Sequence, residues 1–234
     1  MLILAKIWIL IKFFFLGTLQ GITETLPISS SGHLIIFKNI FGFKQANDLS
    51  FEIILHFGSL IAIIYFYRKT IGELIRNFFG YLKNPNIDNK ADFRFVWFIV
   101  LATIPAGIVG FLLEDFIGKY LTNLLTVGIA LLLTGLILTV INKIPKGDKE
   151  RENITWFDAI FIGVLQAIAI IPGISRSGLT TSAGLSRKLN IDNSIKFAFL
   201  IFIPVSLGAM AKDIISYVNN PIEAALVIPY SIAF

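Results

Sequence analysis

The chain has no cysteine and little charge. Of its 234 residues, 15% are Asp, Glu, Lys or Arg, and only two are histidines. The absence of cysteine excludes disulfide bonds and thiolate metal sites. Soluble domains are usually about a quarter charged, so this chain has few polar side chains with which to cover a surface in water. A water-soluble globular domain is therefore not expected.

Apolar residues take the place of the missing charge. They make up 56% of the chain, 22 of them are Phe, and the mean hydropathy is +0.80. Four runs are about long enough to cross the roughly 30 Å hydrocarbon layer as helices. They are residues 51–67, 93–113, 121–141 and 195–210, the last with its flanks. The sequence thus predicts an all-α integral membrane protein.

Two further apolar runs, residues 3–22 and 156–171, lead into stretches rich in Pro, Ser and Gly without reaching a charged loop. We interpret both as re-entrant helical hairpins, because irregular backbone at membrane depth is tolerated only where it lines a cavity or is buried in protein. The longest polar linkers are expected at residues 68–92 and 142–155, and the second of them divides the chain.

The two hairpin sequences resemble each other. FLGTLQGITETLPISSSG from Phe15 aligns with FIGVLQAIAIIPGISRSG from Phe161, at an offset of 145 or 146 residues. Three spans separate the hairpins, so the second copy enters the membrane from the opposite face. The sequence therefore predicts inverted-topology repeats within one membrane domain. Residues 1–145 would hold a hairpin and three transmembrane helices, and residues 146–234 a hairpin with one complete and one partial helix.

Basic residues indicate the orientation of the chain. In this scheme residues 68–94, 142–155 and 187–188 share one side, which holds 12 of the 20 Lys and Arg residues. The positive-inside rule assigns that side to the cytoplasm. The other side carries a smaller group: Lys6, Lys12, Lys38 and Lys44. No nucleic-acid partner is expected, because the basic residues lie in short loops rather than in one patch.

The first hairpin carries polar residues in an apolar setting. Gln20 and Glu24 are four residues apart and share a helix face. Ser30 and His33 follow the break at Pro27. A charge at the centre of a bilayer costs at least about 2.5 to 3.5 kcal/mol, so Glu24 predicts a functional site.

The second hairpin supplies a matching cation. After its Pro-Gly break come Ser175, Arg176, Ser177 and Thr180. A guanidinium is a rigid fork suited to phosphate oxygens, and nearby glycines let backbone amides approach an anion closely. The two hairpins together predict a phosphate site at membrane depth. The simpler alternative is that Arg176 and Glu24 pair as a structural ion bridge.

Structural alternatives apply to other polar residues as well. The run Ser29, Ser30 and Ser31 can serve close helix packing, and a lone His33 can be a satisfied core residue. Glu52 and His56, four residues apart within a span, share a helix face. We expect either that they support the site from behind or that their role is purely structural.

QGITETLPISSSGH, followed later by PGISRSGLT, resembles the double signature of the undecaprenyl-diphosphate phosphatase family, the bacitracin-resistance type of polyprenyl-diphosphate phosphatase. The resemblance implies a plasma-membrane enzyme that removes the terminal phosphate of a polyprenyl diphosphate and so recycles the lipid carrier for cell-envelope glycans. It implies Glu24, Ser30 and His33 as catalytic residues. It also implies a substrate pocket formed by Gln20, Ser29, Ser31, Gly173, Ser175, Arg176, Ser177 and Thr180. A divalent cation, Mg²⁺ or Ca²⁺, is the implied cofactor, with Glu24 as its candidate ligand.

Two departures from the family pattern stand out. Gln20 occupies the first position of the (E/Q)xxxE motif, which disfavours a metal site with two carboxylates. Members of the family usually continue through further helices beyond the counterpart of residues 224–234. A naturally short protein and a truncated sequence would both account for this difference.

The expected chemistry is phosphoryl transfer by Ser30 with His33 as general base, and Glu24 either orients this pair or holds the metal. In alternative mechanisms, His33 or an activated water is the nucleophile. The alternative function is a transporter or flippase for an anionic polyprenyl phosphate, and a homodimer is left open.

Overall fold

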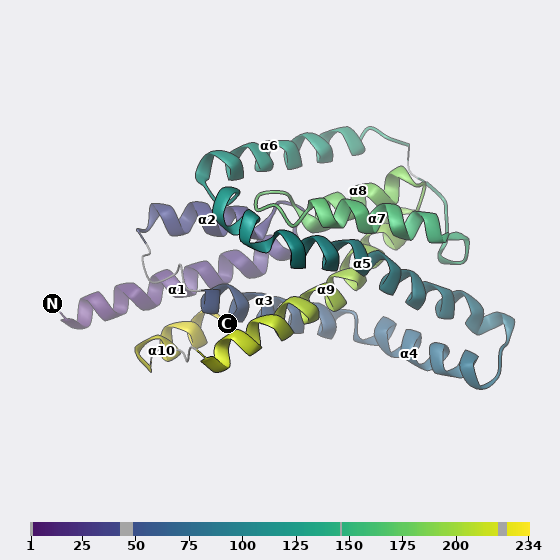
Figure 1. Cartoon of the computed structure of the whole chain (residues 1–234), viewed down its shortest axis with the longest axis horizontal. Helices are drawn as coiled ribbons and strands as arrows, with labels where there is room; N and C mark the ends of the chain where they lie inside the picture. Colours follow the sequence, from purple (N-terminus) through teal and green to yellow (C-terminus); the bar gives the residue numbers. More distant parts are fainter. Residues whose placement is uncertain (1, 43–48, 146, 220–223) are drawn as a thin grey trace.

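The computed structural model describes residues 2–42, 49–145, 147–219 and 224–234. These residues form α-helices and one short 3-10 helix, and no strand (Figure 1). The elements in chain order are α1 (Leu2–Thr25), α2 (Ser30–Ile40), α3 (Leu49–Phe66), α4 (Arg68–Lys83), α5 (Ile87–Tyr120), α6 (Leu124–Ile141), η2 (Arg151–Asn153), α7 (Trp156–Ile168), α8 (Arg176–Ser186), α9 (Ile191–Asn219) and α10 (Ala224–Ala233). The predicted all-α membrane class is confirmed.

Four helices of the described part of the chain are long and apolar enough to cross a membrane. They are α1, α5, α6 and α9, and α3 with α4 makes a fifth span if this bent pair is counted as one. Helices α5 and α9 are longer than the predicted apolar runs, because each helix continues into the polar residues that flank its run. Helix α1 has 24 residues, so it is long enough to cross by itself.

The polar linker predicted at residues 68–92 is wrong. This stretch folds as α4 and the first turns of α5. Its apolar residues recur three to four positions apart, which is the spacing of one helix face. Leu74 on that face is buried, and Phe78 stacks on Phe93 of α5 with 5.1 Å between the ring centroids. The second predicted linker, residues 142–155, contains η2.

Two helical hairpins meet at the centre of the molecule. Helices α1 and α2 come from one end of its long axis, and α7 and α8 come from the other (Figure 1). Their tips are in contact: a Cβ on Gly32 would lie 2.9 Å from the Cα of Gly173. Gly173 has a φ of 98°, a conformation that favours glycine. The local sequence thus permits the tips to approach closely.

Two glycines at matching positions of the hairpin sequences lie at close helix contacts. Gly17 on α1 and Gly163 on α7 are 146 residues apart, and each allows a second helix to approach. A Cβ would lie 1.9 Å from the carbonyl oxygen of Ala233 at the first position, and 2.5 Å from that of Ala102 at the second. The bilayer orientation of the repeats, and the division at residues 145 and 146, stay predictions.

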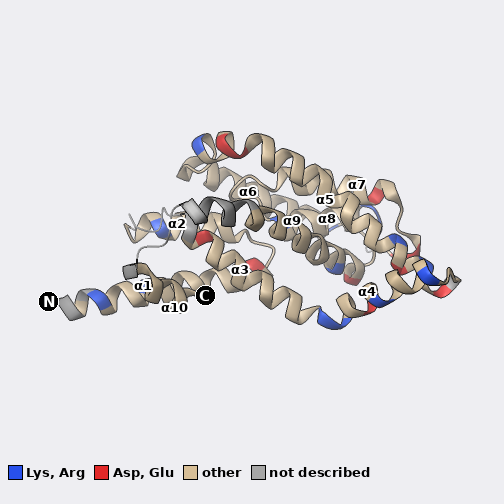
Figure 2. Ribbon diagram, turned by 60° about the horizontal axis from the view of Figure 1, so that its bottom comes forward, with Lys and Arg blue, Asp and Glu red and all other residues tan. Residues whose placement is uncertain are grey.

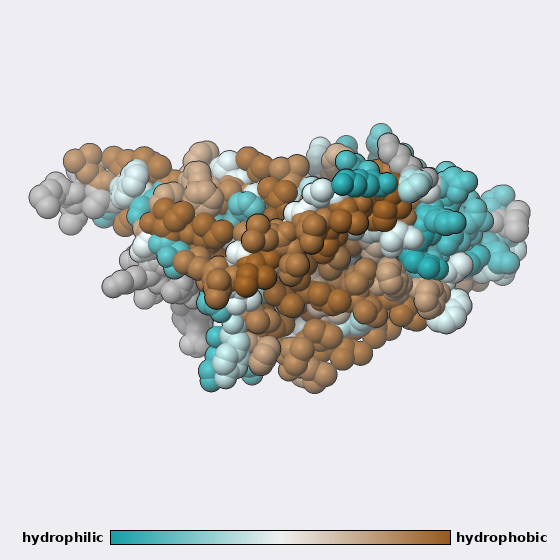
Figure 3. Space-filling model, turned by 90° about the horizontal axis from the view of Figure 1, so that it is seen from above, coloured by the Kyte–Doolittle hydropathy of each residue, from teal (hydrophilic) through white to brown (hydrophobic). Residues whose placement is uncertain are grey.

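The charged segments gather at one end of the molecule. Figure 2 shows Lys and Arg around α4 and the nearby loops, and Figure 3 shows a hydrophilic end beside a broad hydrophobic surface. Arg151 donates to Asp92 at 2.5 Å, and the Lys149 amide donates to the Lys188 carbonyl at 3.0 Å. The basic segments predicted to share one side therefore lie together, whereas Lys44 and Lys146 fall outside the described residues.

A buried carboxylate fixes the start of the second hairpin at this charged end. Asp158 caps α7 with Thr155 and forms ion pairs with Lys149 at 2.6 Å and Arg187 at 2.8 Å. Burial would raise the pKa of Asp158, but hydrogen bonds from Lys149, Thr155 and Arg187 outweigh it and lower the pKa to about 2. The ionised carboxylate thus ties α7 to the loop on one side and to the end of α8 on the other.

Candidate active site

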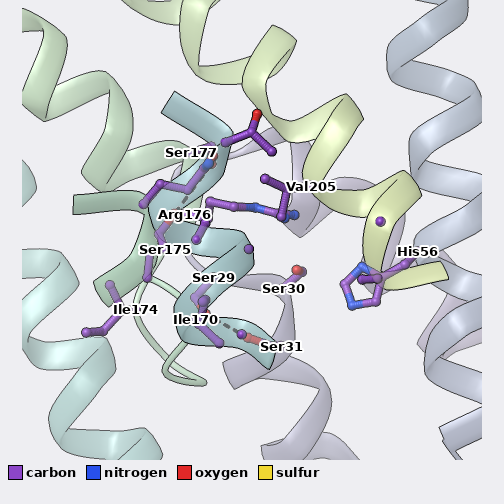
Figure 4. Close-up of a pocket in the computed structure, with 18 of the residues that line it drawn as sticks. Ser29, Ser30, Ser31, His56, Ile170, Ile174, Ser175, Arg176, Ser177 and Val205 are labelled. Carbon is purple, nitrogen blue, oxygen red and sulfur yellow. Dashed lines mark hydrogen bonds between the residues drawn. The ribbon is translucent and has the colours of Figure 1, made fainter. Parts of the chain in front are cut away.

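A cavity of about 680 Å³ lies where the hairpin tips meet, and α3, α5 and α9 complete its wall (Figure 4). One part of the wall is polar. It is formed by Glu24, Ser29, Ser30, Ser31, His56, Ser175, Arg176 and Ser177. The predicted meeting of the two polar hairpins in one cavity is therefore seen in the structure.

Glu24 is the centre of the polar wall. Its side chain is 8% exposed. One carboxylate oxygen accepts from the Arg176 guanidinium at 3.0 Å. The other accepts from the Ser30 hydroxyl at 2.5 Å and from the Gln20 amide at 2.8 Å. The carboxylate is thus shared between a cation and a hydroxyl that donates a hydrogen bond to it.

Arg176 is held from two sides. Besides the ion pair with Glu24, its guanidinium carbon lies 4.0 Å from the centre of the Phe202 ring on α9. Cation–π contacts of this kind are worth about 0.5 to 2 kcal/mol. A guanidinium has five N–H donors, so Arg176 keeps donors for a ligand while it is held in place.

Two helix N-termini belong to the site. Ser29 caps α2 by accepting from the Gly32 amide at 3.3 Å, and Ser175 caps α8 by accepting from the Gly178 amide at 3.1 Å. Both caps line the cavity, and helix N-termini carry partial positive charge that favours anions. Ser29 has a φ of 69°, which is uncommon outside glycine and often found at functional sites.

Thr134 of α6 holds the second tip from behind. Its hydroxyl donates to the Gly173 carbonyl at 3.0 Å and accepts from the Ser175 amide at 3.0 Å. The residue is 5% exposed. One side chain therefore satisfies two backbone groups of the tip directly before Arg176.

The two histidines lie in different settings. His56 of α3 lines the cavity, with its Nδ1 3.4 Å from the Gln20 amide nitrogen and 3.9 Å from a Glu24 oxygen. His33 is not part of the cavity wall, and its Nδ1 lies 2.8 Å from the Ser29 carbonyl oxygen. The structure thus places His56, rather than His33, beside Glu24.

Three residues predicted to bind substrate stand behind the wall. Gln20 is 1% exposed, and its amide contacts the cavity-lining residues Glu24 and His56. Gly173 shapes the tip, and the Thr180 hydroxyl donates to the Arg176 carbonyl of its own helix at 2.7 Å. Their contacts are those of supporting groups, and a direct role in binding stays a prediction.

Sequence reasoning did not identify the walls contributed by α5 and α9. Thr103, Ala106, Gly107 and Gly110 come from α5, and Pro204, Val205, Gly208 and Ala209 from α9. Neither Thr134 nor Phe202 was selected. Thr134 is 41 residues from its partner Ser175, and Phe202 is one of 22 Phe residues, so no local pattern marks them. The small residues next to Pro105 and Pro204 are a sequence feature that could have indicated a cavity here.

The protein residues available as metal ligands suit a cation that is coordinated mainly by oxygen atoms of a bound ligand. Among the described residues, no group of three or more His, Asp or Glu side chains could hold a metal ion. Mg²⁺ sites, however, often combine one or two protein oxygens with substrate phosphates and water. Glu24 offers a carboxylate, and the neighbouring Gln20 has a buried carbonyl oxygen with no hydrogen-bond partner in the part of the chain that the structure describes. These two residues would hold such an ion.

The fold and the site define a helical membrane protein with a buried acid, hydroxyl and guanidinium around one cavity. The chain belongs to the family described as bacitracin resistance protein BacA, whose family model matches residues 13–234.

Relatives at about 40% identity cover nearly the whole chain. It is 43% identical over 229 residues to the "Undecaprenyl-diphosphatase" of Oceanobacillus iheyensis, covering 97% of this chain and 82% of the relative. It is 39% identical to "Undecaprenyl-diphosphatase 1" of Bacillus cereus, covering 98% and 84%. It is also 39% identical to "Undecaprenyl-diphosphatase 1" of Halalkalibacterium halodurans, covering 98% and 83%.

Proposed function

We propose that this chain hydrolyses undecaprenyl diphosphate, or a closely related polyprenyl diphosphate, to the monophosphate and phosphate in the plasma membrane. Its product would be the lipid carrier on which cell-envelope glycans are assembled. The observation that carries this proposal is the joint placement of Ser30 and Arg176 on the two oxygens of Glu24. The names of the relatives support the same reaction.

The proposed first step is attack of the Ser30 oxygen on the terminal phosphorus. Glu24 accepts the hydroxyl proton as the O–P bond forms, and the bond to the bridging oxygen breaks to release polyprenyl monophosphate. A phosphoserine remains. Glu24 passes its proton to the departing monophosphate oxygen and is ionised again. Water then attacks this phosphoserine with Glu24 as base, the Ser30–phosphate bond breaks, the proton goes from Glu24 to the Ser30 oxygen, and inorganic phosphate leaves. Proton and phosphoryl group are balanced over the two steps.

Charge neutralisation is the main task of the remaining residues, because the transferred group carries negative charge throughout. Arg176 would turn part of its donor set from Glu24 to the phosphate oxygens. The N-termini of α2 and α8 face the same cavity and would hold the two phosphates from opposite sides. A Mg²⁺ or Ca²⁺ ion held by Glu24 and Gln20 would neutralise further charge.

The choice of Glu24 as base replaces the His33 expected from the sequence. Glu24 accepts a hydrogen bond from Ser30 at 2.5 Å, whereas His33 does not line the cavity. His56 is next to Glu24, with 3.9 Å between its Nδ1 and a carboxylate oxygen. A phosphoenzyme on His33, or turnover without any phosphoenzyme, remains the alternative that experiment separates from this one.

The lipid part of the substrate suits the other half of the cavity. Apart from Thr103 and Glu114, its walls on α5 and α9 consist of small or apolar residues, among them Ala106, Gly107 and Val205. Helices α5 and α9 are also long and apolar enough to cross a bilayer. The diphosphate would therefore sit at the hairpin tips while the prenyl chain runs between these helices.

Phosphate release from undecaprenyl diphosphate by purified protein in detergent tests the proposal, because a micelle does not separate two compartments between which transport could occur. The native chain should release phosphate, and Ser30→Ala and Arg176→Ala should lose it. Ser231→Ala is a matched control, because this exposed hydroxyl donates to the Val227 carbonyl of its own helix, away from the cavity wall. Release that persists in both site variants would reject the site, and no release by the native chain would favour binding or transport.

A further inference from the structure

The exposed side of α4 (Arg68–Lys83) combines apolar and basic residues in an order that indicates a lipid partner. We propose that α4 lies in the membrane interface at the charged end of the molecule and binds the headgroups of anionic phospholipids. This proposal is independent of the reaction proposed above.

The apolar face of α4 is only half covered by protein. Leu74 is buried, and Phe78 and Tyr81 stack on Phe93 of α5, with 5.1 and 4.6 Å between ring centroids. The adjacent strip of the same face is open. It consists of Ile75, Phe79 and Leu82, which are 53%, 57% and 57% exposed.

Basic residues border this open strip. At 100° per residue, the helix places Arg68, Lys83, Arg76 and Lys69 next to Phe79, on the side away from α5. All four are exposed, and none is in an ion pair among the described residues. Glu73 is the single acidic residue of the helix. A strip of exposed apolar side chains beside a strip of Lys and Arg is the pattern of helices that lie at the surface of anionic membranes.

The position of α4 agrees with an interfacial location. It is bent by 70° from α3, so the two do not form one straight span. It is fixed in this direction, because Asn77 donates to Asp92 at the start of α5 with 2.6 Å between the atoms. In Figure 2 its basic residues lie at the end where the other charged loops gather, and Figure 3 shows the hydrophilic end directly adjoining the hydrophobic surface.

Depth measurements test the location. The chain has no cysteine, so Phe79→Cys and Glu73→Cys each introduce one site for an environment-sensitive fluorophore. In phosphatidylcholine–phosphatidylglycerol vesicles, a label at residue 79 should be quenched more by lipids brominated near the headgroup end of the acyl chain than by lipids brominated near its terminus. A label at residue 73, on the polar face, should be quenched by neither. A label at residue 79 that behaves as if in water, or that lies deep in the bilayer, would overturn the proposal.

Lipid retention tests the headgroup. Native mass spectrometry would compare phosphatidylglycerol with phosphatidylcholine bound to the purified chain and to Lys69→Gln/Arg76→Gln. Each basic residue near an anionic surface contributes about fivefold, so the double variant should lose about 25-fold in its preference for phosphatidylglycerol. Lys6→Gln/Lys119→Gln removes two exposed charges elsewhere and should keep the preference. Equal preference in both double variants would refute headgroup binding by α4, whether or not the chain hydrolyses a diphosphate.

Discussion

Replacing Thr134 by Val should disturb the site without touching its wall. Valine has nearly the same shape, so no cavity is created, and the change removes the two hydrogen bonds to the Gly173 carbonyl and the Ser175 amide. A buried backbone group left without a partner costs about 1 to 3 kcal/mol, so the two together cost about 2 to 6 kcal/mol if the tip stays in place. If the tip moves instead, Arg176 moves with it, and each 1.4 kcal/mol lost in the transition state lowers kcat/KM about tenfold.

The assay combines thermal unfolding in detergent with kcat/KM for phosphate release. We expect Thr134→Val to lower one or both, and Thr134→Ser, which keeps the hydroxyl, to restore both. Thr139→Val on the same helix is the control, because this exposed hydroxyl donates to the Gly135 carbonyl of its own helix. Native values for Thr134→Val in both measurements, or an equal loss in Thr139→Val, would refute the role assigned to Thr134.

Three further predictions follow from the contacts described. Glu24→Gln removes the proposed base, so phosphate release measured at saturating substrate should fall by about 10² to 10⁴; a loss below tenfold would contradict that role. Phe202→Leu removes the cation–π contact with Arg176 and should reduce kcat/KM by about 2- to 30-fold, while Phe199→Leu, in the same helix, serves as control. Asp158 has its pKa lowered from 3.8 to about 2, so its ionised form contributes about 2 kcal/mol of stability above pH 3.8, and this is lost as the pH falls towards 2. Asp158→Asn should therefore lose less stability than the native chain as the pH falls through this range. The same pH dependence of the free energy of unfolding in both proteins would contradict the prediction.

The contact between the two hairpins could be predicted from the sequence because a charged side chain in an apolar setting needs a partner of opposite charge. A carboxylate at Glu24 and a guanidinium at Arg176 are both costly in an apolar chain, and each is the partner that the other needs. The Pro and Gly residues that interrupt the helices also mark the tips, which explains why the cavity could be expected there.

Other features depend on contacts that no local pattern reveals. Thr134 acts on a tip 39 to 41 residues away, and its hydroxyl resembles any other Thr of an apolar helix. His33 is two residues beyond the Ser run, yet its position on α2 leaves it off the cavity wall, while His56 reaches Glu24 from α3. Helix α4 was missed because its charges suggested a loop, although its apolar residues have helical spacing.

Trapping the covalent intermediate tests the proposed chemistry most directly. Purified protein would be mixed with undecaprenyl diphosphate labelled in its terminal phosphate, quenched during turnover with a denaturant at mildly alkaline pH, where phosphoserine and phosphohistidine both survive, and digested to locate the label. We predict phosphoserine at Ser30, and no label in Ser30→Ala. Label on a histidine, or full phosphate release by Ser30→Ala without any labelled residue, would contradict the assignment of Ser30 as nucleophile and Glu24 as its base.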